Sequence, residues 1–177
     1  MVSFSYRREF SSVIGEVLRP VASVELKAVR GHWFPASMYI DSGADMTLIP
    51  SDFGKLLGMD LSKNRSALVG VTGSPMKVSL QSTQIKIGAS VQEAKVAVAL
   101  RNDVPYLLGR DGVFEAFRIT FEEINALTTF HPSRRSMRRP VMPKPVRVRA
   151  VRSKWGREAF PDAGEATFGG QRQDSHR

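Results

Sequence analysis

An aspartate, a hydroxyl residue and a glycine stand together between two short apolar runs. Asp41-Ser42-Gly43 is flanked by Met38–Ile40 and Met46–Ile49, a pattern that predicts a strand, a tight loop and a second strand. A carboxylate at the end of a buried strand is poorly solvated, which suits it to acid–base chemistry. Ser42 can hydrogen-bond locally, and Gly43 allows a sharp turn or a close approach of another chain. The loop is therefore a candidate catalytic centre.

A second motif begins 65 residues after Asp41. Tyr106–Gly112 reads Tyr-Leu-Leu-Gly-Arg-Asp-Gly, an apolar pair followed by glycine, arginine and aspartate. Between the two motifs, Leu68–Val78 predicts a hairpin with a glycine-bearing tip. Because Asp-Ser-Gly alone is common in ordinary turns, the interpretation depends on all three features together.

The combination resembles the retropepsin (retroviral-type) branch of the aspartic proteases. Asp41-Ser42-Gly43-Ala44 is similar to the active-site signature of that family, and Leu107–Asp111 is similar to its second hallmark. The resemblance covers roughly residues 13–123. It implies an aspartic endopeptidase that acts on a peptide or protein substrate without a metal or cofactor. It also implies an all-β fold, a closed retropepsin-like barrel with one or two short helices, completed as a homodimer.

The predicted chemistry needs more than one carboxyl group. Hydrolysis without a metal or covalent nucleophile requires one group that accepts a proton from water and another that donates one. Two adjacent carboxyls sharing one proton meet both demands, and aspartic proteases are the standard example. Two other places in the chain could offer a second motif of aspartate, hydroxyl residue and glycine, and neither fits. Asp111-Gly112 lacks a residue between the aspartate and the glycine, and Asp162-Ala163-Gly164 has no hydroxyl residue and lies in the polar C-terminal segment. We therefore predict a two-fold homodimer in which each protomer contributes Asp41.

The resemblance also implies supporting roles for the residues around Asp41. Ser42 would hydrogen-bond to the loop of the second protomer, Asp45 would hold the substrate backbone, and Arg110 would brace this region through an ion pair. The hairpin tip would be a mobile flap that closes over an extended peptide. The flap residues expected to bind substrate are Gly70, Val71, Thr72 and Gly73, and the other expected structural residues are Ala44, Gly109 and Asp111.

Apolar residues near the motifs are candidates for substrate side-chain pockets, although each also suits the core. These residues are Ile49, Val71, Met76 and Val104.

Alternation of apolar and polar residues predicts a series of short strands. Two short helices are expected as well: Ser51–Gly58, with Ser51 as N-cap and Gly58 as terminator, and Gly112–Ala116, capped by Asp111. The main expected strands are Val13–Leu18, Val21–Val29, Trp33–Ile40, Gln84–Gly88, Val91–Val98, Tyr106–Gly109 and Phe117–Phe121.

The formal charge of +9 is concentrated at the C-terminal end. Residues 1–130 contain 14 Lys and Arg against 13 Asp and Glu, whereas residues 131–177 contain 12 against 4. We expect residues 1–125 to form the protease domain and residues 126–177 to form a basic, proline-containing, disordered tail.

Two functional alternatives for the tail stay open. One is a nucleic-acid-binding arm, and the other is a built-in substrate that the dimer cleaves. The arm would bind phosphates through its basic residues and stack bases on its aromatic residues. The basic residues include Arg134, Arg135, Arg138, Arg139, Lys144, Arg147, Arg149, Arg152 and Lys154, and the aromatic residues are Trp155, Phe160 and Phe168.

A second class of function also stays open. The fold could serve as a dimerisation or peptide-holding scaffold with little catalysis, while the tail binds nucleic acid. The intact Asp-Ser-Gly-Ala favours the enzyme, because a scaffold gives no reason to bury paired carboxyls on a dimer axis.

Composition excludes several other functions. With no cysteine, the chain has no disulfide, thiolate nucleophile or cysteine metal site. His32, His131 and His176 lack metal-ligand spacing, so no metal is expected. The N-terminal residues lack the apolar core of a signal peptide, and Val96–Leu100 is about the longest apolar run. We therefore expect a cytoplasmic protein without membrane contact.

Overall fold

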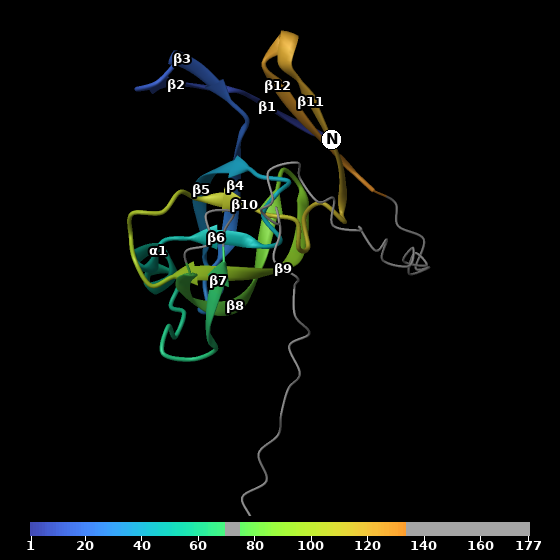
Figure 1. Ribbon diagram of the computed structural model, residues 1–177. Coiled ribbons are helices and arrows are strands. Elements are labelled where there is room, and N and C mark those ends of the chain that lie inside the picture. Colours follow the sequence, from blue (N-terminus) through green and yellow to red (C-terminus); the bar gives the residue numbers. More distant parts are fainter. Residues whose placement is uncertain (70–74, 134–177) are drawn as a thin grey trace, which may run out of the picture. The chain divides into compact units, whose positions relative to one another are not determined.

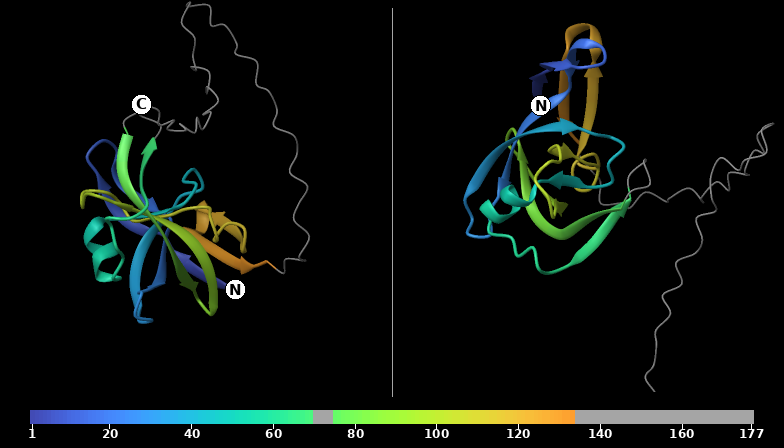
Figure 2. Two further views of the ribbon diagram at one scale, coloured as in Figure 1. Left: turned by 90° about the horizontal axis from the view of Figure 1, so that it is seen from below. Right: turned by 60° about the vertical axis from the view of Figure 1, so that its left-hand side comes forward.

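The computed structural model describes residues 1–69 and 75–133 (Figure 1). One sheet has the strand order β4-β5-β10-β6-β9-β8-β7, and β4 also pairs with β8. This pairing closes the run from β4 to β8 into a ring, with β7 attached outside it; Figure 2 shows the ring from two further directions. Its strands are β4 (Val21–Lys27), β5 (Trp33–Ile40), β6 (Thr47–Ile49), β7 (Arg65–Val69), β8 (Pro75–Ile87), β9 (Ser90–Ala99) and β10 (Leu107–Leu108).

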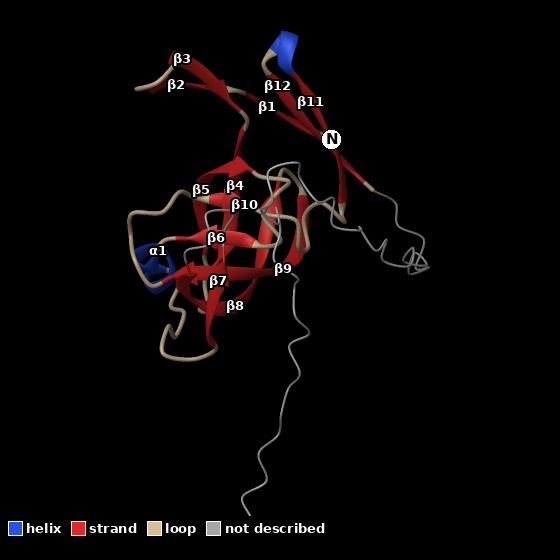
Figure 3. Ribbon diagram, in the orientation of Figure 1, coloured by secondary structure: helices blue, strands red, loops and turns tan. Residues whose placement is uncertain are grey.

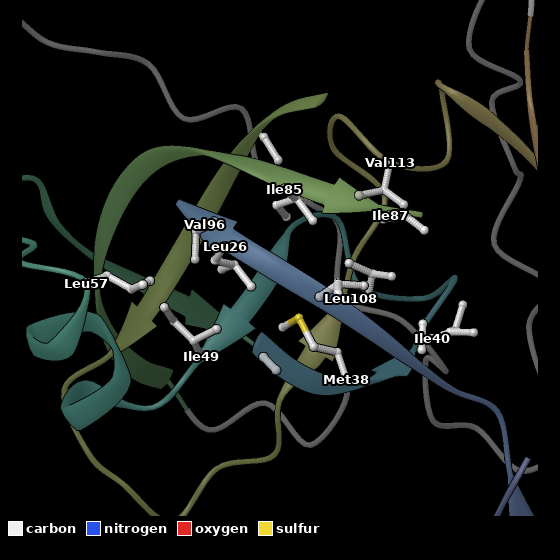
Figure 4. Packing of buried hydrophobic residues seen from close by; sticks show 14 of the residues in the cluster. Leu26, Met38, Ile40, Ile49, Leu57, Ile85, Ile87, Val96, Leu108 and Val113 are labelled. Atoms are coloured by element: carbon white, nitrogen blue, oxygen red, sulfur yellow. The ribbon is translucent and has the colours of Figure 1, made fainter. Parts of the chain in front are cut away.

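Alternating side chains of these strands fill the ring. Along β4, Ala22, Val24 and Leu26 are buried, and along β5 Met38 and Ile40 are buried. Side chains from several strands gather in one core (Figure 4). The alternation of apolar and polar residues that predicted these strands therefore also determines which side chains face the core.

The most informative feature of the topology is the position of β10. Although β5 and β6 follow each other in the chain, β10 lies between them, parallel to β5 and antiparallel to β6. Leu107 stands opposite both Tyr39 of β5 and Leu48 of β6. The connection over residues 41–46 must therefore cross from one side of β10 to the other, which brings the two sequence motifs together.

A second sheet joins the two ends of the described chain. It has the order β1-β12-β11, formed by β1 (Val2–Ser5), β11 (Phe117–Glu122) and β12 (Leu127–Pro132). Phe130 of β12 is fully buried and makes edge-to-face contacts with Phe4 and Phe117. Strand pairing thus continues past residue 125, where the sequence analysis ended the domain, because burial of Phe130 holds β12 in place.

The remaining strands form a ribbon of β2 (Arg7–Ser11) and β3 (Gly15–Arg19). Sequence analysis did not predict β1, β2 or β12, and it began the β3 segment at Val13, which lies in the turn. Gly15 has a φ of +78°, a backbone conformation suited to the end of that turn. The two strand segments predicted between Pro75 and Gly88 are a single strand, β8.

Helices make a minor contribution to the described structure (Figure 3). Helix α1 (Ser51–Leu56) is present, and Gly58, with a φ of +77°, follows its end as predicted. Its N-cap is Pro50 rather than Ser51, because the Ser51 hydroxyl donates instead to Asn102 Oδ1 at 2.8 Å. Besides α1, a 3-10 turn spans Glu123–Asn125.

The prediction of a second helix over Gly112–Ala116 is wrong. These residues form consecutive turns, in which the backbone N–H groups of Val113 and Phe114 both donate to Arg110 O. Gly112 has a φ of +72°, which interrupts a right-handed helix at its first residue. No helix within the described residues is long and apolar enough to cross a membrane.

Substitution of Phe130 tests whether β12 is part of the folded domain. We expect Phe130→Ala to lower the free energy of unfolding by about 3–5 kcal/mol, because it leaves a cavity between two aromatic neighbours. Phe121→Ala, on the neighbouring strand, is the matched control, since Phe121 is 40% exposed. Equal midpoints for the two variants in urea unfolding would show that β12 contributes little.

Candidate active site

Asp41 directly follows β5 and is half-buried. Its backbone N–H donates to Leu108 O at 3.1 Å, so β10 fixes the end of β5. Its Oδ1 accepts a hydrogen bond from the Gly43 N–H at 2.8 Å. A Cβ added to Gly43 would lie 3.3 Å from that same oxygen. Gly43 therefore orients the Asp41 carboxylate and also leaves room for it.

Backbone hydrogen bonds join the two motifs. Arg110 N–H donates to Ala44 O, and Asp111 N–H donates to Asp45 O, each at 2.9 Å. These bonds continue the contact between Asp41 and β10 along the loop. Ala44, Arg110 and Asp111, which the sequence proposed as structural residues, take part in these contacts through their backbone atoms.

Gly109 lies where the loop crosses the chain that follows β10. A Cβ on Gly109 would lie 2.2 Å from the Met46 carbonyl carbon and 2.7 Å from the Thr47 nitrogen. Side chains cannot approach backbone this closely, so only glycine fits. The Gly109 N–H donates to Thr47 Oγ1 at 3.3 Å.

Arg110 braces the loop in a different way from the one implied by the resemblance. Among the described residues, it forms no ion pair with Asp45. Its Nη1 donates to the Ser42 carbonyl oxygen at 3.4 Å, and its guanidinium carbon lies 6.0 Å from the centre of the Phe114 ring. The guanidinium thus contacts the backbone of the Asp41 loop rather than a carboxylate.

Asp111 connects the second motif to β9. Its Oδ2 accepts a hydrogen bond from the Lys95 N–H at 2.7 Å. This contact replaces the helix-capping role that the sequence predicted for Asp111. Together with the Asp45 contact, it ties the chain after β10 to two separate parts of the ring.

A cavity of about 440 Å³ opens beside Asp41. Asp41 follows Tyr39 by two residues, and both side chains line it. Glu9 and Arg19, from the β2–β3 ribbon, contribute charged groups, and sequence analysis missed both because the ribbon was not predicted. The lining residues are Glu9, Arg19, Pro20, Tyr39, Ile40, Asp41, Pro105 and Leu107.

Glu9 is held firmly in this wall. The Tyr39 hydroxyl lies 2.8 Å from both Glu9 oxygens, Arg7 Nε donates to Oε1 at 2.7 Å, and Arg19 Nε lies 3.2 Å from Oε2. The hydrogen bond from Tyr39, followed by the interactions with Arg7 and Arg19, lowers the pKa of Glu9 below its usual value. Glu9 therefore stays ionised in acid better than an ordinary glutamate.

Other candidates take different positions. Ile49 is fully buried in the main core, whereas Met76 and Val104 pack against a smaller apolar cluster that includes Leu48 and Val78. The flap residues Gly70, Val71, Thr72 and Gly73 lie outside the described residues. Within residues 1–69 and 75–133, no three His, Asp or Glu side chains are grouped so that they could hold a metal ion.

Residues 27–111 match a family model described as aspartyl protease, and this segment contains both motifs. The structure is similar to a retropepsin-like aspartic protease from Rickettsia conorii, with a TM-score of 0.50 and 18% identity, covering 72% of this chain and 98% of that chain. This chain resembles the retropepsin-like aspartic proteases. The predicted retropepsin-like fold is therefore confirmed, and family and fold together support a protease function.

The EIAV protease complexed with the inhibitor HBY-793 is 23% identical, with a TM-score of 0.39, and the match covers 52% of this chain and 82% of that chain. No curated protein sequence matches the chain. The match to the aspartyl protease family model begins at Lys27, so it does not include the β2–β3 ribbon.

Gly109 provides a test of the loop crossing. We expect Gly109→Ala to lower the free energy of unfolding by about 3 kcal/mol or more, because its Cβ would collide with backbone atoms. Gly31→Ala is the control: Gly31 has a φ of +92° but no atom within 4 Å of an added Cβ, so its cost is conformational strain of about 1–2 kcal/mol. Equal losses of stability in chemical denaturation would contradict the proposed crowding.

Proposed function

We propose that the protein is an aspartic endopeptidase that acts as a homodimer, with Asp41 of each protomer sharing one proton. The position of the Asp41 carboxylate carries this proposal. It lies in the wall of a cavity, at the end of β5 in a retropepsin-like fold, and Gly43 holds one of its oxygens.

Glu9 is the other carboxylate in the same cavity wall and is the intrachain alternative to a second Asp41. It is a poor partner for a shared proton because both its oxygens already accept hydrogen bonds or ion pairs. Two arginines also favour its ionised form. The second carboxyl is therefore assigned to another copy of the chain, which brings the same loop to a two-fold axis.

In this mechanism the ionised member of the pair accepts a proton from a water molecule as that water attacks the peptide carbonyl carbon. The protonated member donates to the carbonyl oxygen. As the tetrahedral intermediate collapses, the C–N bond breaks and the protonated member of the pair donates its proton to the departing nitrogen. A hydroxyl of the intermediate gives its proton to the ionised member as the carbonyl group of the product acid forms. The pair then again holds one shared proton.

The remaining site assignments form part of the same proposal. Ser42 is exposed and would hydrogen-bond to the opposite loop across the dimer axis. Asp45, also exposed, would bind the substrate backbone, and residues 70–73 would cover the bound peptide. Residues 1–125 would carry catalysis. The comparisons do not support nucleic-acid binding by the basic tail, whose residues from 134 onward lie outside the described structure.

Replacement of the carboxylate tests the proposal. Asp41→Asn should reduce cleavage of a mixed peptide library at least about 100-fold, because the pair loses its proton-accepting group. The matched control is Asp52→Asn, an exposed carboxylate on α1 that pairs with Lys55 outside the cavity. Cleavage by the wild type should be strongest below neutral pH, since deprotonation of both carboxyls removes the acid.

The result that would overturn the proposal is a folded Asp41→Asn variant that cleaves the library as fast as Asp52→Asn does. Wild-type protein that cleaves no peptide between about pH 3 and 7 would also overturn it. Circular dichroism of both variants checks that each is folded.

A further inference from the structure

We propose that Arg19 makes the cavity beside Asp41 selective for substrates with an acidic side chain, glutamate or aspartate, at the position that enters it. This inference rests on the proposed function, because it assigns a preference to the same site. The residues that carry it lie on the β2–β3 ribbon, outside the segment 27–111 that matches the aspartyl protease family.

The ribbon places three charges on one face. Arg7 and Glu9 are two residues apart in β2, and Arg19 of β3 stands opposite Arg7. Two opposed arginines repel each other, and Glu9 offsets this repulsion by contacting both. The three groups together carry a formal charge of +1 on the ribbon, and of the three only Glu9 and Arg19 line the cavity.

The two arginines differ in how fully they are engaged. Arg7 binds Glu9 and lies over the Tyr39 ring, with its guanidinium carbon 5.1 Å from the ring centre. Arg19 contacts Glu9 through Nε, and its Nη groups have no hydrogen-bond partner among the described residues. Its side chain is 49% exposed and lines the cavity. Arg19 therefore has donors available for a ligand.

The rest of the wall suits a side chain with an apolar stem. Pro20, Ile40, Pro105 and Leu107 line the cavity together with the Tyr39 ring. A glutamate would place its methylene groups against these residues and its carboxylate on the Arg19 fork, where charge-assisted hydrogen bonds are strong. A lysine at the same position would be repelled by the positive charge of Arg19.

Binding to a variant that cannot cleave measures this preference directly. We would use full-length Asp41→Asn and fluorescein-labelled octapeptide libraries in which one position at a time is fixed as Glu, Gln, Leu or Lys. Fluorescence anisotropy at about pH 6, where glutamate is ionised, gives the dissociation constants. At one position we expect Glu to bind about tenfold more tightly than Gln.

Substitution on the ribbon then identifies the responsible residue. Adding Arg19→Gln should abolish the preference for Glu over Gln. Arg8→Gln is the matched control, because Arg8 is exposed, pairs with Glu16 and does not line the cavity; it should keep the preference. Arg19→Lys keeps the charge on the ribbon but lacks the planar fork, so it should reduce the preference without abolishing it.

The inference is overturned if no library binds, if Glu and Gln bind equally at every position, or if the preference survives Arg19→Gln. Cleavage by the wild-type protein separates this inference from the proposed function. Cleavage without any preference for Glu would remove the inference and leave the peptidase. A binding preference for Glu that depends on Arg19, without any cleavage by the wild-type protein, would support the inference and remove the proposed peptidase activity.

Discussion

The crossing of the Asp41 loop over the end of β10 is the constraint on which the rest of the structure depends. β10 separates two strands that are consecutive in the chain, so the loop between them must pass the end of β10 at close range. Backbone hydrogen bonds from Asp41, Arg110 and Asp111 fix this crossing. Gly109 makes it sterically feasible, since any side chain there would overlap Met46. The Asp41 carboxylate thus takes its position from backbone contacts between two distant motifs.

The ribbon adds a second influence on the site. Glu9 and Arg19 reach the cavity from strands that precede the ring, and the hydroxyl of Tyr39 connects them to β5. In this arrangement the ring positions the Asp41 carboxylate, whereas the ribbon contributes the charged side chains of Glu9 and Arg19. Asp41 and the charged pair of Glu9 and Arg19 therefore reach the cavity from separate elements.

The sequence predicted those parts of the site that depend on local pattern. Apolar alternation predicted β4 and β11, and the two motifs singled out Asp41 and Gly109. It could not predict contacts that depend on the positive φ of Gly112 or on the route of the Arg110 side chain. The positions of Glu9 and Arg19 were also out of reach, because they arise from the pairing of β3 with β2, and β2 was not predicted from the sequence.

The central claim is that two copies of Asp41 form one active site, and a subunit-mixing experiment tests it most directly. Wild-type protein and Asp41→Asn would be mixed in equal amounts, allowed to exchange subunits, and assayed at constant total concentration. If each site needs Asp41 from both protomers, random pairing leaves about one quarter of the wild-type activity. Retention of about one half would mean that each protomer acts alone, and would contradict the account.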